Sequence, residues 1–229
     1  MILKISGISI EVCKKDIKNM RLYVKPPNGK VVISAPLSMS RETIEQFVRS
    51  KVNWIKRHIA KFEEQQCRSK REYVSGETLY VWGKRYFLQT NFGGRNSLVL
   101  SGDKAVLTVR KGSTVSQREK YVREWYRKLL KAEIPQVLFK WENKTGLKAE
   151  SWQVKNMTSR WGSCKIKEKK ITLSLLLAGK DAQCLDYIIL HELLHFMEKR
   201  HNQRFYNLLG KYMPAWRYVR AAMNKQVLD

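Results

Sequence analysis

The 229-residue chain lacks the features that mark membrane proteins, disulfide scaffolds and zinc fingers. No apolar run approaches the roughly 20 residues that a membrane-spanning helix needs. The N-terminal stretch MILKISGISIEVCKK alternates in polarity like a strand, whereas a secretion signal contains an unbroken apolar segment. The four cysteines lie far apart and form no Cys-x-x-Cys pair, so neither a zinc knuckle nor a disulfide framework is indicated. We therefore expect a cytoplasmic protein with reduced cysteines and no membrane association.

Acidic residues are scarce, because 20 aspartates and glutamates stand against 45 lysines and arginines. The resulting net charge of +25 suggests a polyanionic partner such as nucleic acid or a nucleotide. The basic residues are scattered through every segment, and the chain has no RNA-binding aromatic signature or basic heptad segment. A dedicated nucleic-acid groove and a merely solvated cationic surface both remain open.

Hydrophobic periodicity changes character near residue 112. Residues 1–112 contain short strand candidates and one long helix over residues 40–66, where Ser40 is a suitable N-cap. From Ser116 the pattern becomes helical, and Pro135 should kink that helix or begin a new one. Two strand candidates follow, SWQVKNM and KKITLSLLLA, and then another helix. We expect an α+β fold, with a strand-rich N-terminal region 1–112 and a second domain 113–229.

The segment HELLHFMEKRH, residues 191–201, holds three of the four histidines. Asp181 can cap a helix here that is apolar on nearly every side, which is typical of a buried helix. His191 and His195 lie four residues apart, about 40° around the axis and about 6 Å along it, so both imidazoles can meet at one ion. Together with Glu192 they form H-E-x-x-H, in which two histidines hold zinc and the glutamate acts as general base. The pattern also arises by chance, but unpaired groups in a buried helix are costly and a cation would pair with them.

A third histidine, His201, can join this site only if the helix ends first. Six residues of unbroken helix would rotate it by about 120° from His195. Asn202 can cap a new helix, QRFYNLLGKYM, that ends before Pro214, so we expect a break near EKRH. Glu198 stands where the longer metzincin pattern has a glycine, and the backbone path should therefore differ. Glu198 is itself an alternative third ligand, or a residue that supports the ligands.

Four segments together resemble the YgjP-like metallopeptidase domain family over nearly the whole chain. They are APLSMSRETIEQFVRSKVNWI, GKRYFL, SRWGSC and HELLHFMEKRHNQRFY. The resemblance implies a zincin-like catalytic half, with its active-site helix packed on a small sheet, in which His191, His195 and His201 bind one Zn²⁺ and Glu192 is the base. It also suggests kinship with SprT-like proteases, which cleave proteins attached to DNA. Pro135 and Tyr206, where tryptophan is expected, depart from the family pattern without touching the ligand set.

The segment RWGSC, residues 160–164, has two interpretations. It can form the edge strand, or its turn, along which zincins bind an extended substrate. Arg160 is then a candidate for stabilising an oxyanion or a phosphate. Alternatively, Trp161 and Cys164 are packing residues and Gly162 makes a turn.

These features predict a zinc-dependent metallohydrolase, a peptidase whose water is activated by Glu192 and whose substrates include proteins associated with nucleic acid. One alternative is a metal-dependent hydrolase of nucleotide phosphoanhydrides, which the charge favours. H-E-x-x-H argues against it, because phosphoryl-transfer sites more often hold magnesium with carboxylates. Another alternative is a nucleic-acid-binding module with structural zinc, closed by a fourth ligand such as Cys164.

Overall fold

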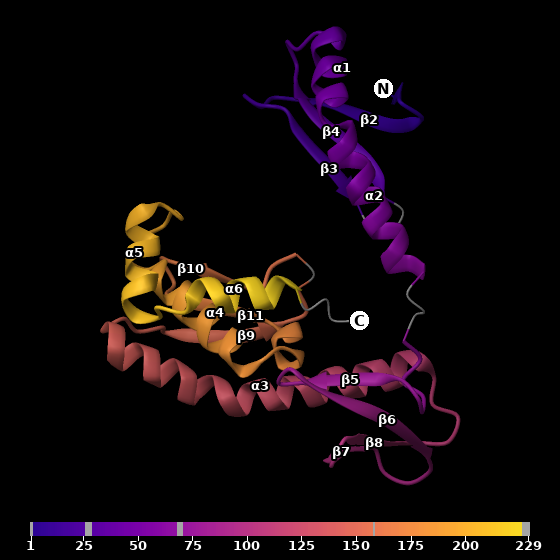
Figure 1. The fold of residues 1–229 in the computed structure, drawn as a ribbon, viewed down its shortest axis with the longest axis vertical. Helices are drawn as coiled ribbons and strands as arrows, with labels where there is room; N and C mark the ends of the chain where they lie inside the picture. Colours follow the sequence, from indigo (N-terminus) through magenta and orange to yellow (C-terminus); the bar gives the residue numbers. More distant parts are fainter. Residues whose placement is uncertain (1, 26–28, 68–70, 158, 226–229) are drawn as a thin grey trace. The chain divides into compact units, whose positions relative to one another are not determined.

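The computed structural model describes residues 2–25, 29–67, 71–157 and 159–225. It divides into two compact units, Met1–Lys70 and Arg71–Asp229 (Figure 1). In chain order the elements are β1 (Ile2–Ile5), β2 (Ile8–Lys15), β3 (Arg21–Lys25), β4 (Lys30–Pro36), α1 (Arg41–Ser50), α2 (Val52–Cys67), β5 (Thr78–Val81), β6 (Lys84–Phe92), β7 (Ser97–Ser101), β8 (Lys104–Val109), α3 (Val115–Thr145), β9 (Ser151–Lys155), β10 (Gly162–Lys165), β11 (Lys170–Ser174), the 3₁₀-helix η1 (Leu175–Gly179), α4 (Ala182–Leu194), α5 (Gln203–Tyr212) and α6 (Trp216–Lys225). This is the α+β fold that the sequence predicts. None of the helices in the described ranges combines the length and the hydropathy that crossing a bilayer requires.

The first unit is a four-stranded sheet of order β1-β2-β4-β3 with α1 and α2 packed on its buried face. β2 and β4 are parallel, and the two outer pairs are antiparallel. Alternate residues of the strands point to the helices, as the period of two predicts. The helices contribute Ile44, Val48 and Ile55 to the core beneath this face.

The single helix predicted over residues 40–66 is instead two consecutive helices, α1 and α2. Ser40 caps α1 as expected, and its hydroxyl accepts a hydrogen bond from the Thr43 amide at 3.2 Å. Lys51 has φ −109° and ψ 3°, and its amide donates to the Val48 carbonyl oxygen at 2.9 Å. This tight i to i−3 bond ends α1, and a new helix starts at the next residue.

The second unit begins with a four-stranded sheet, of order β5-β6-β8-β7, that packs on α3. Val122 of α3 lies in the core of this sheet, and the Tyr126 hydroxyl donates a hydrogen bond to the Tyr80 carbonyl oxygen at 2.8 Å. The Trp82 amide donates to the Ala178 carbonyl oxygen, also at 2.8 Å. These contacts join the sheet to the C-terminal half. The division between the compact units along the chain therefore falls between residues 70 and 71, whereas the periodicity of the sequence predicts a boundary near residue 112.

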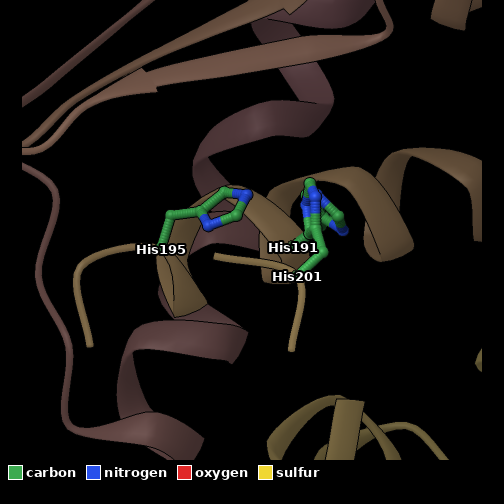
Figure 2. Close-up of side chains that lie close together, drawn as sticks. All are labelled: His191, His195 and His201. Atoms are coloured by element: carbon green, nitrogen blue, oxygen red, sulfur yellow. The ribbon is translucent and has the colours of Figure 1, made fainter. Parts of the chain in front are cut away.

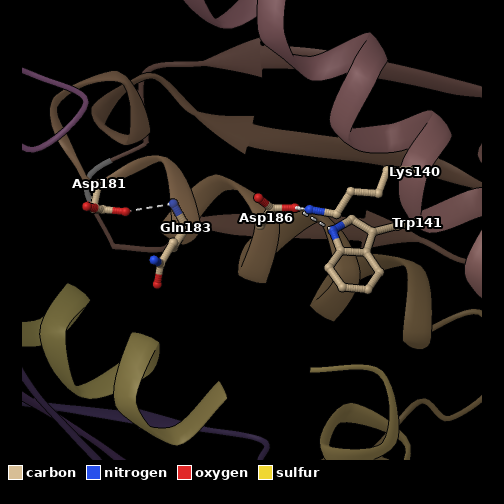
Figure 3. Close-up of polar contacts among 5 residues, drawn as sticks. All are labelled: Lys140, Trp141, Asp181, Gln183 and Asp186. Atoms are coloured by element: carbon tan, nitrogen blue, oxygen red, sulfur yellow. Dashed lines mark hydrogen bonds and ion pairs between the residues drawn. The ribbon is translucent and has the colours of Figure 1, made fainter. Parts of the chain in front are cut away.

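The long helix α3 connects the two halves of the second unit. Thr114 caps its start, and Pro135 lies within the helix without ending it. Farther along, Lys140 and Trp141 both donate to the carboxylate of Asp186 on α4 (Figure 3). A carboxylate that accepts two donors from a neighbouring helix fixes the position of α4 against α3.

A three-stranded sheet of order β10-β11-β9 packs beside α4. β10 is antiparallel to β11, and β9 is parallel to it. Within the described residues β10 pairs on one side only, so it is an edge strand of this sheet. The LLLA end of the predicted strand KKITLSLLLA forms η1 instead, because the Ser174 hydroxyl caps a 3₁₀ turn there. α4 is buried on nearly every side, as the apolar pattern predicts.

Candidate metal centre

Both helices that carry the histidine segment begin where the sequence predicts, but the first ends at Leu194, before the break predicted near EKRH. Asp181 caps α4, and its carboxylate accepts from the Gln183 amide at 2.8 Å (Figure 3). α4 ends at Leu194, and His195 is its C-cap. Asn202 caps α5, and its side chain accepts from the Phe205 amide at 3.0 Å. The break between the helices turns the chain back, so His201 returns to the end of α4.

His191, His195 and His201 gather at this break (Figure 2). One ligand nitrogen from each ring lies within 4.8 Å of the other two. The Nε2 atoms of His191 and His201 are 2.9 Å apart. Two imidazole nitrogens this close need a proton or a cation between them, because neutral nitrogens present lone pairs to one another. The chemistry and the spacing of these donors therefore fit a metal ion.

His195 is oriented by the backbone of the break. Its Nδ1 lies 3.0 Å from the carbonyl oxygen of Glu198, so Nδ1 carries the hydrogen and Nε2 remains available to a metal. The Glu198 carboxylate instead accepts from the Arg200 amide at 3.4 Å. In the described part of the chain the cluster contains three histidines and neither Glu198 nor Cys164. Glu198 thus contacts His195 through its carbonyl group and is not brought to the cluster as a ligand.

The aromatic ring of Phe205 packs against all three imidazoles. The ring of Phe205 is fully buried, and its centroid lies 4.9 Å from that of His191, 4.8 Å from that of His195 and 4.9 Å from that of His201. On the outer side, Tyr206 stacks on His201 with centroids 6.3 Å apart, and Trp216 of α6 stacks on Tyr206 at 5.2 Å. These rings restrict where the imidazoles can move.

Two of the three histidines, His191 and His201, are shifted toward the neutral form that binds metals. Burial, followed by the neighbouring His195 and His201, lowers the pKa of His191 to about 3. Burial also lowers the pKa of His201, with His195 and the Arg220 guanidinium adding to the effect. The Nδ1 atom of His191 is buried and has no hydrogen-bond partner among the described residues. An unprotonated imidazole is ready to coordinate without first losing a proton.

Glu192 lies beside the cluster in a buried position, with 5% of its surface exposed. Burial raises its pKa to about 7, against the opposing effects of a hydrogen bond from Cys164 and the positive charge of Arg160. Burial and the same glutamate raise the pKa of the Cys164 thiol to about 12, so this sulfur stays protonated and unreactive. Arg160 is exposed, and its charge reaches Glu192.

Gly162 explains part of the RWGSC segment. A Cβ atom at this position would lie 2.7 Å from Oε1 of Glu192 and 2.8 Å from Cγ2 of Ile188. Its φ is not in the left-handed region, so the residue does not serve the turn that the sequence suggests. It leaves the space that lets β10 lie directly against α4. The glycine therefore brings the edge strand to the carboxyl group of Glu192.

Two features of the site were not predicted from the sequence. In the sequence, Phe205 is one apolar residue of an amphipathic helix, and nothing nearby indicates that its ring contacts three histidines. Arg220 lies on α6, and its charge lowers the pKa values of His191 and His201. No local pattern marks it, because the contact depends on how α6 packs on α4.

The solved structures similar to this chain include two metallopeptidase zymogens. Abylysin of Pyrococcus abyssi is 18% identical, with a TM-score of 0.37, and the match covers 41% of this chain and 95% of that one. Jannalysin of Methanocaldococcus jannaschii is 24% identical, with a TM-score of 0.38, and the match covers 42% of this chain and 97% of that one. No curated protein matches. The model of the YgjP-like metallopeptidase domain matches residues 18–226. The chain therefore belongs to the YgjP-like metallopeptidase domain family and is a metal-dependent hydrolase.

Proposed function

We propose that the chain is a zinc-dependent peptidase in which His191, His195 and His201 hold the metal and Glu192 is the general base. The observation that carries this proposal is the convergence of three imidazoles, two of them with lowered pKa values, beside one buried carboxyl group. Three imidazoles suit zinc well and leave a fourth coordination position open. When bound, zinc supplies a Lewis acid that polarises a carbonyl group and makes a water molecule more acidic.

The protein's own groups move the protons. Glu192 accepts a proton from the attacking water and passes it to the leaving amine. A carboxyl group with a pKa near 7 suits both transfers, because it can gain and lose a proton close to neutral pH. Arg160 supplies a positive charge on the side of β10, where it stabilises negative charge on the carbonyl oxygen.

The edge strand β10 is the docking strand for the substrate in this proposal. An extended peptide can pair with its unoccupied side and add a strand to the sheet. Gly162 begins this strand and contacts Glu192, so a peptide bond paired there lies next to the base. The net charge of +25 supports substrates that are associated with nucleic acid.

The two alternative functions have less support. Phosphoanhydride hydrolysis calls for carboxylates around magnesium, and the only candidate metal group in the described ranges consists of histidines. Structural zinc calls for a fourth protein ligand, but the Cys164 thiol faces Glu192 and lies outside the histidine cluster.

The test combines metal content with turnover. Wild-type protein, H195A, H201A and E192Q are loaded with zinc, dialysed and measured by elemental mass spectrometry and by hydrolysis of an unfolded protein substrate. We expect about one zinc per chain in wild type and E192Q, and loss of zinc in both histidine variants. E192Q should lose turnover while it keeps its metal. Full turnover by E192Q would remove Glu192 as the base.

A further inference from the structure

A second concave site lies in the same unit, away from the histidines. It is a pocket of about 200 Å³ between α3, β5 and η1, which we call the two-arginine pocket. Its lining comprises Arg71, Tyr73, Tyr80, Val122, Arg123, Tyr126, Asn156, Leu175, Leu176 and Gly179. The lining contains two guanidinium groups and no acidic residue. Such a pocket favours an anionic group attached to an apolar body.

The guanidinium groups of the pocket have spare capacity for an anion. Among acidic residues whose side chains the structure describes, none forms an ion pair with Arg71, and Arg123 pairs through one nitrogen with Glu119 at 2.6 Å. Burial, followed by the negative charge of Glu119, raises the pKa of Tyr73, while the nearby charges of Arg71 and Arg123 oppose that rise. Both positive charges therefore act on the same aromatic wall.

Tyr73 is held in an unusual conformation at this wall. Its φ is +57°, a region that large side chains rarely adopt, and its ring is 9% exposed. The Thr90 hydroxyl donates to its carbonyl oxygen at 3.0 Å, and Glu77 accepts from the amide of Val74 at 3.4 Å. Backbone strain of this kind persists where surrounding contacts enforce it, and such positions concentrate at binding sites.

Sheet topology places the pocket at the end of the sheet where β9 and β11 finish and β10 begins. Asn156 directly follows β9, and Leu175 directly follows β11. β9 and β11 are parallel, so their carboxyl termini lie at the same end of the sheet. β10 is antiparallel to β11 and begins at the same end of the sheet, where Gly162 pairs with Leu173. The pocket and the Glu192 side of β10 thus share one end of the sheet.

The same topology sets the direction in which a peptide paired with β10 would run. A peptide that pairs antiparallel with β10 runs parallel to β11, so its C-terminal part leaves the sheet at the end that holds the pocket. Residues after the bond beside Glu192 leave the sheet at this end and, at about 3.3 Å per residue, have to cross the ends of β10 and β11 to reach Arg71 and Arg123.

We propose, on the basis of the function proposed above, that the two-arginine pocket binds a carboxylate of the polypeptide substrate on the C-terminal side of the cleaved bond. The carboxylate is either an acidic side chain or the C-terminus of the substrate. Arg71 and Arg123 pair with it, and the tyrosine rings and Leu176 contact the methylene groups or neighbouring residues that carry it.

Binding is measured first, without cleavage, on zinc-loaded E192Q protein by fluorescence anisotropy. The probes are four otherwise identical extended peptides with a neutral dye, in which a Glu near the C-terminus is kept or replaced by Gln and the C-terminus is free or amidated. We expect the doubly neutral peptide to bind about ten-fold more weakly than the best acidic peptide. Comparison of the two singly neutral peptides identifies the source of the carboxylate. Moving the Glu to the N-terminal part should abolish its benefit.

Variants then assign the effect to the pocket. R71A and R123A should each reduce the acidic preference to near unity while the affinity for the doubly neutral peptide stays unchanged. E119Q removes the ion pair of Arg123 but keeps the guanidinium, and R85A removes an exposed arginine outside the pocket; both should keep the preference. Equal binding of all four peptides, or an equal loss for acidic and neutral peptides in R71A, would overturn the inference.

Cleavage separates this inference from the proposed function. If wild-type protein cleaves the peptides with no acidic preference, the pocket assignment fails and the peptidase proposal stands. If the acidic preference in binding is present but no peptide is cleaved under any metal condition, the pocket assignment stands and the peptidase proposal fails.

Discussion

Replacement of Gly162 by alanine should disturb Glu192, the proposed base, and leave the proposed metal ligands intact. The added Cβ would lie 2.7 Å from Oε1 of Glu192 and 2.8 Å from Cγ2 of Ile188, both closer than real Cβ contacts allow. Ile188 is 5% exposed and packed in the core, so it cannot simply rotate away. Overpacking a well-filled core costs about 1–3 kcal/mol. We expect a free energy of unfolding lower by this amount, and turnover at least about ten-fold lower because Glu192 is displaced.

The measurement is urea denaturation together with turnover and zinc content, on G162A and on a matched control. G210A adds the same methyl group inside α5, where the Cβ would lie 3.6 Å from Nε1 of Trp216, an ordinary contact. Alanine is better than glycine within a helix by about 1 kcal/mol, so G210A should be as stable as wild type or more so. Full stability and full turnover of G162A would refute the argument that β10 needs this space.

Three further outcomes are expected. In metal-free protein, the buried Glu192 has a pKa near 7 against an ordinary 4.5. The folded state therefore binds a proton more tightly than the unfolded state, and the free energy of unfolding falls as pH rises from 4.5 through 7. In urea titrations, the free energy of unfolding of E192Q should match that of wild type near pH 4.5 and exceed it by about 3 kcal/mol at pH 8.5. Loss of the Tyr206 ring in Y206L should weaken zinc binding about two- to ten-fold in chelator competition, because His201 loses its stacking partner, whereas Y206W should keep the affinity. Burial lowers the pKa of Lys180, so wild-type stability should rise relative to K180M as pH approaches 10.5, and parallel pH profiles of the two proteins would count against a charged Lys180 beneath Trp161.

The candidate site was predicted well where local chemistry decides structure. Asp181 and Asn202 are short polar residues before apolar helices, and both cap as predicted. The requirement that His201 face the same point as His195 forces a helix break, and the structure has that break. Cap preference and helix geometry depend on a few adjacent residues, so the sequence carries them directly.

The remaining features depend on distant segments. Lys51 divides the helix predicted over residues 40–66, although the apolar spacing continues across it. The predicted boundary near residue 112 differs from the division at residues 70 and 71, because Val122 and Tyr126 of α3 pack on the second sheet. Gly162 approaches Glu192 only once β10 lies on α4. Periodicity shows which residues are buried but not which partner buries them.

The histidine cluster is formed by residues close together in the sequence, whereas the environment of Glu192 is formed by residues farther apart. All three imidazoles come from the short segment His191–His201, which needs little loop closure to bring them together. The burial that raises the pKa of Glu192 depends on β10 and its Gly162, which belong to a separate strand. The proposed metal ligands therefore depend on a local turn of the chain, whereas the pKa of the proposed base depends on how the sheet packs on α4.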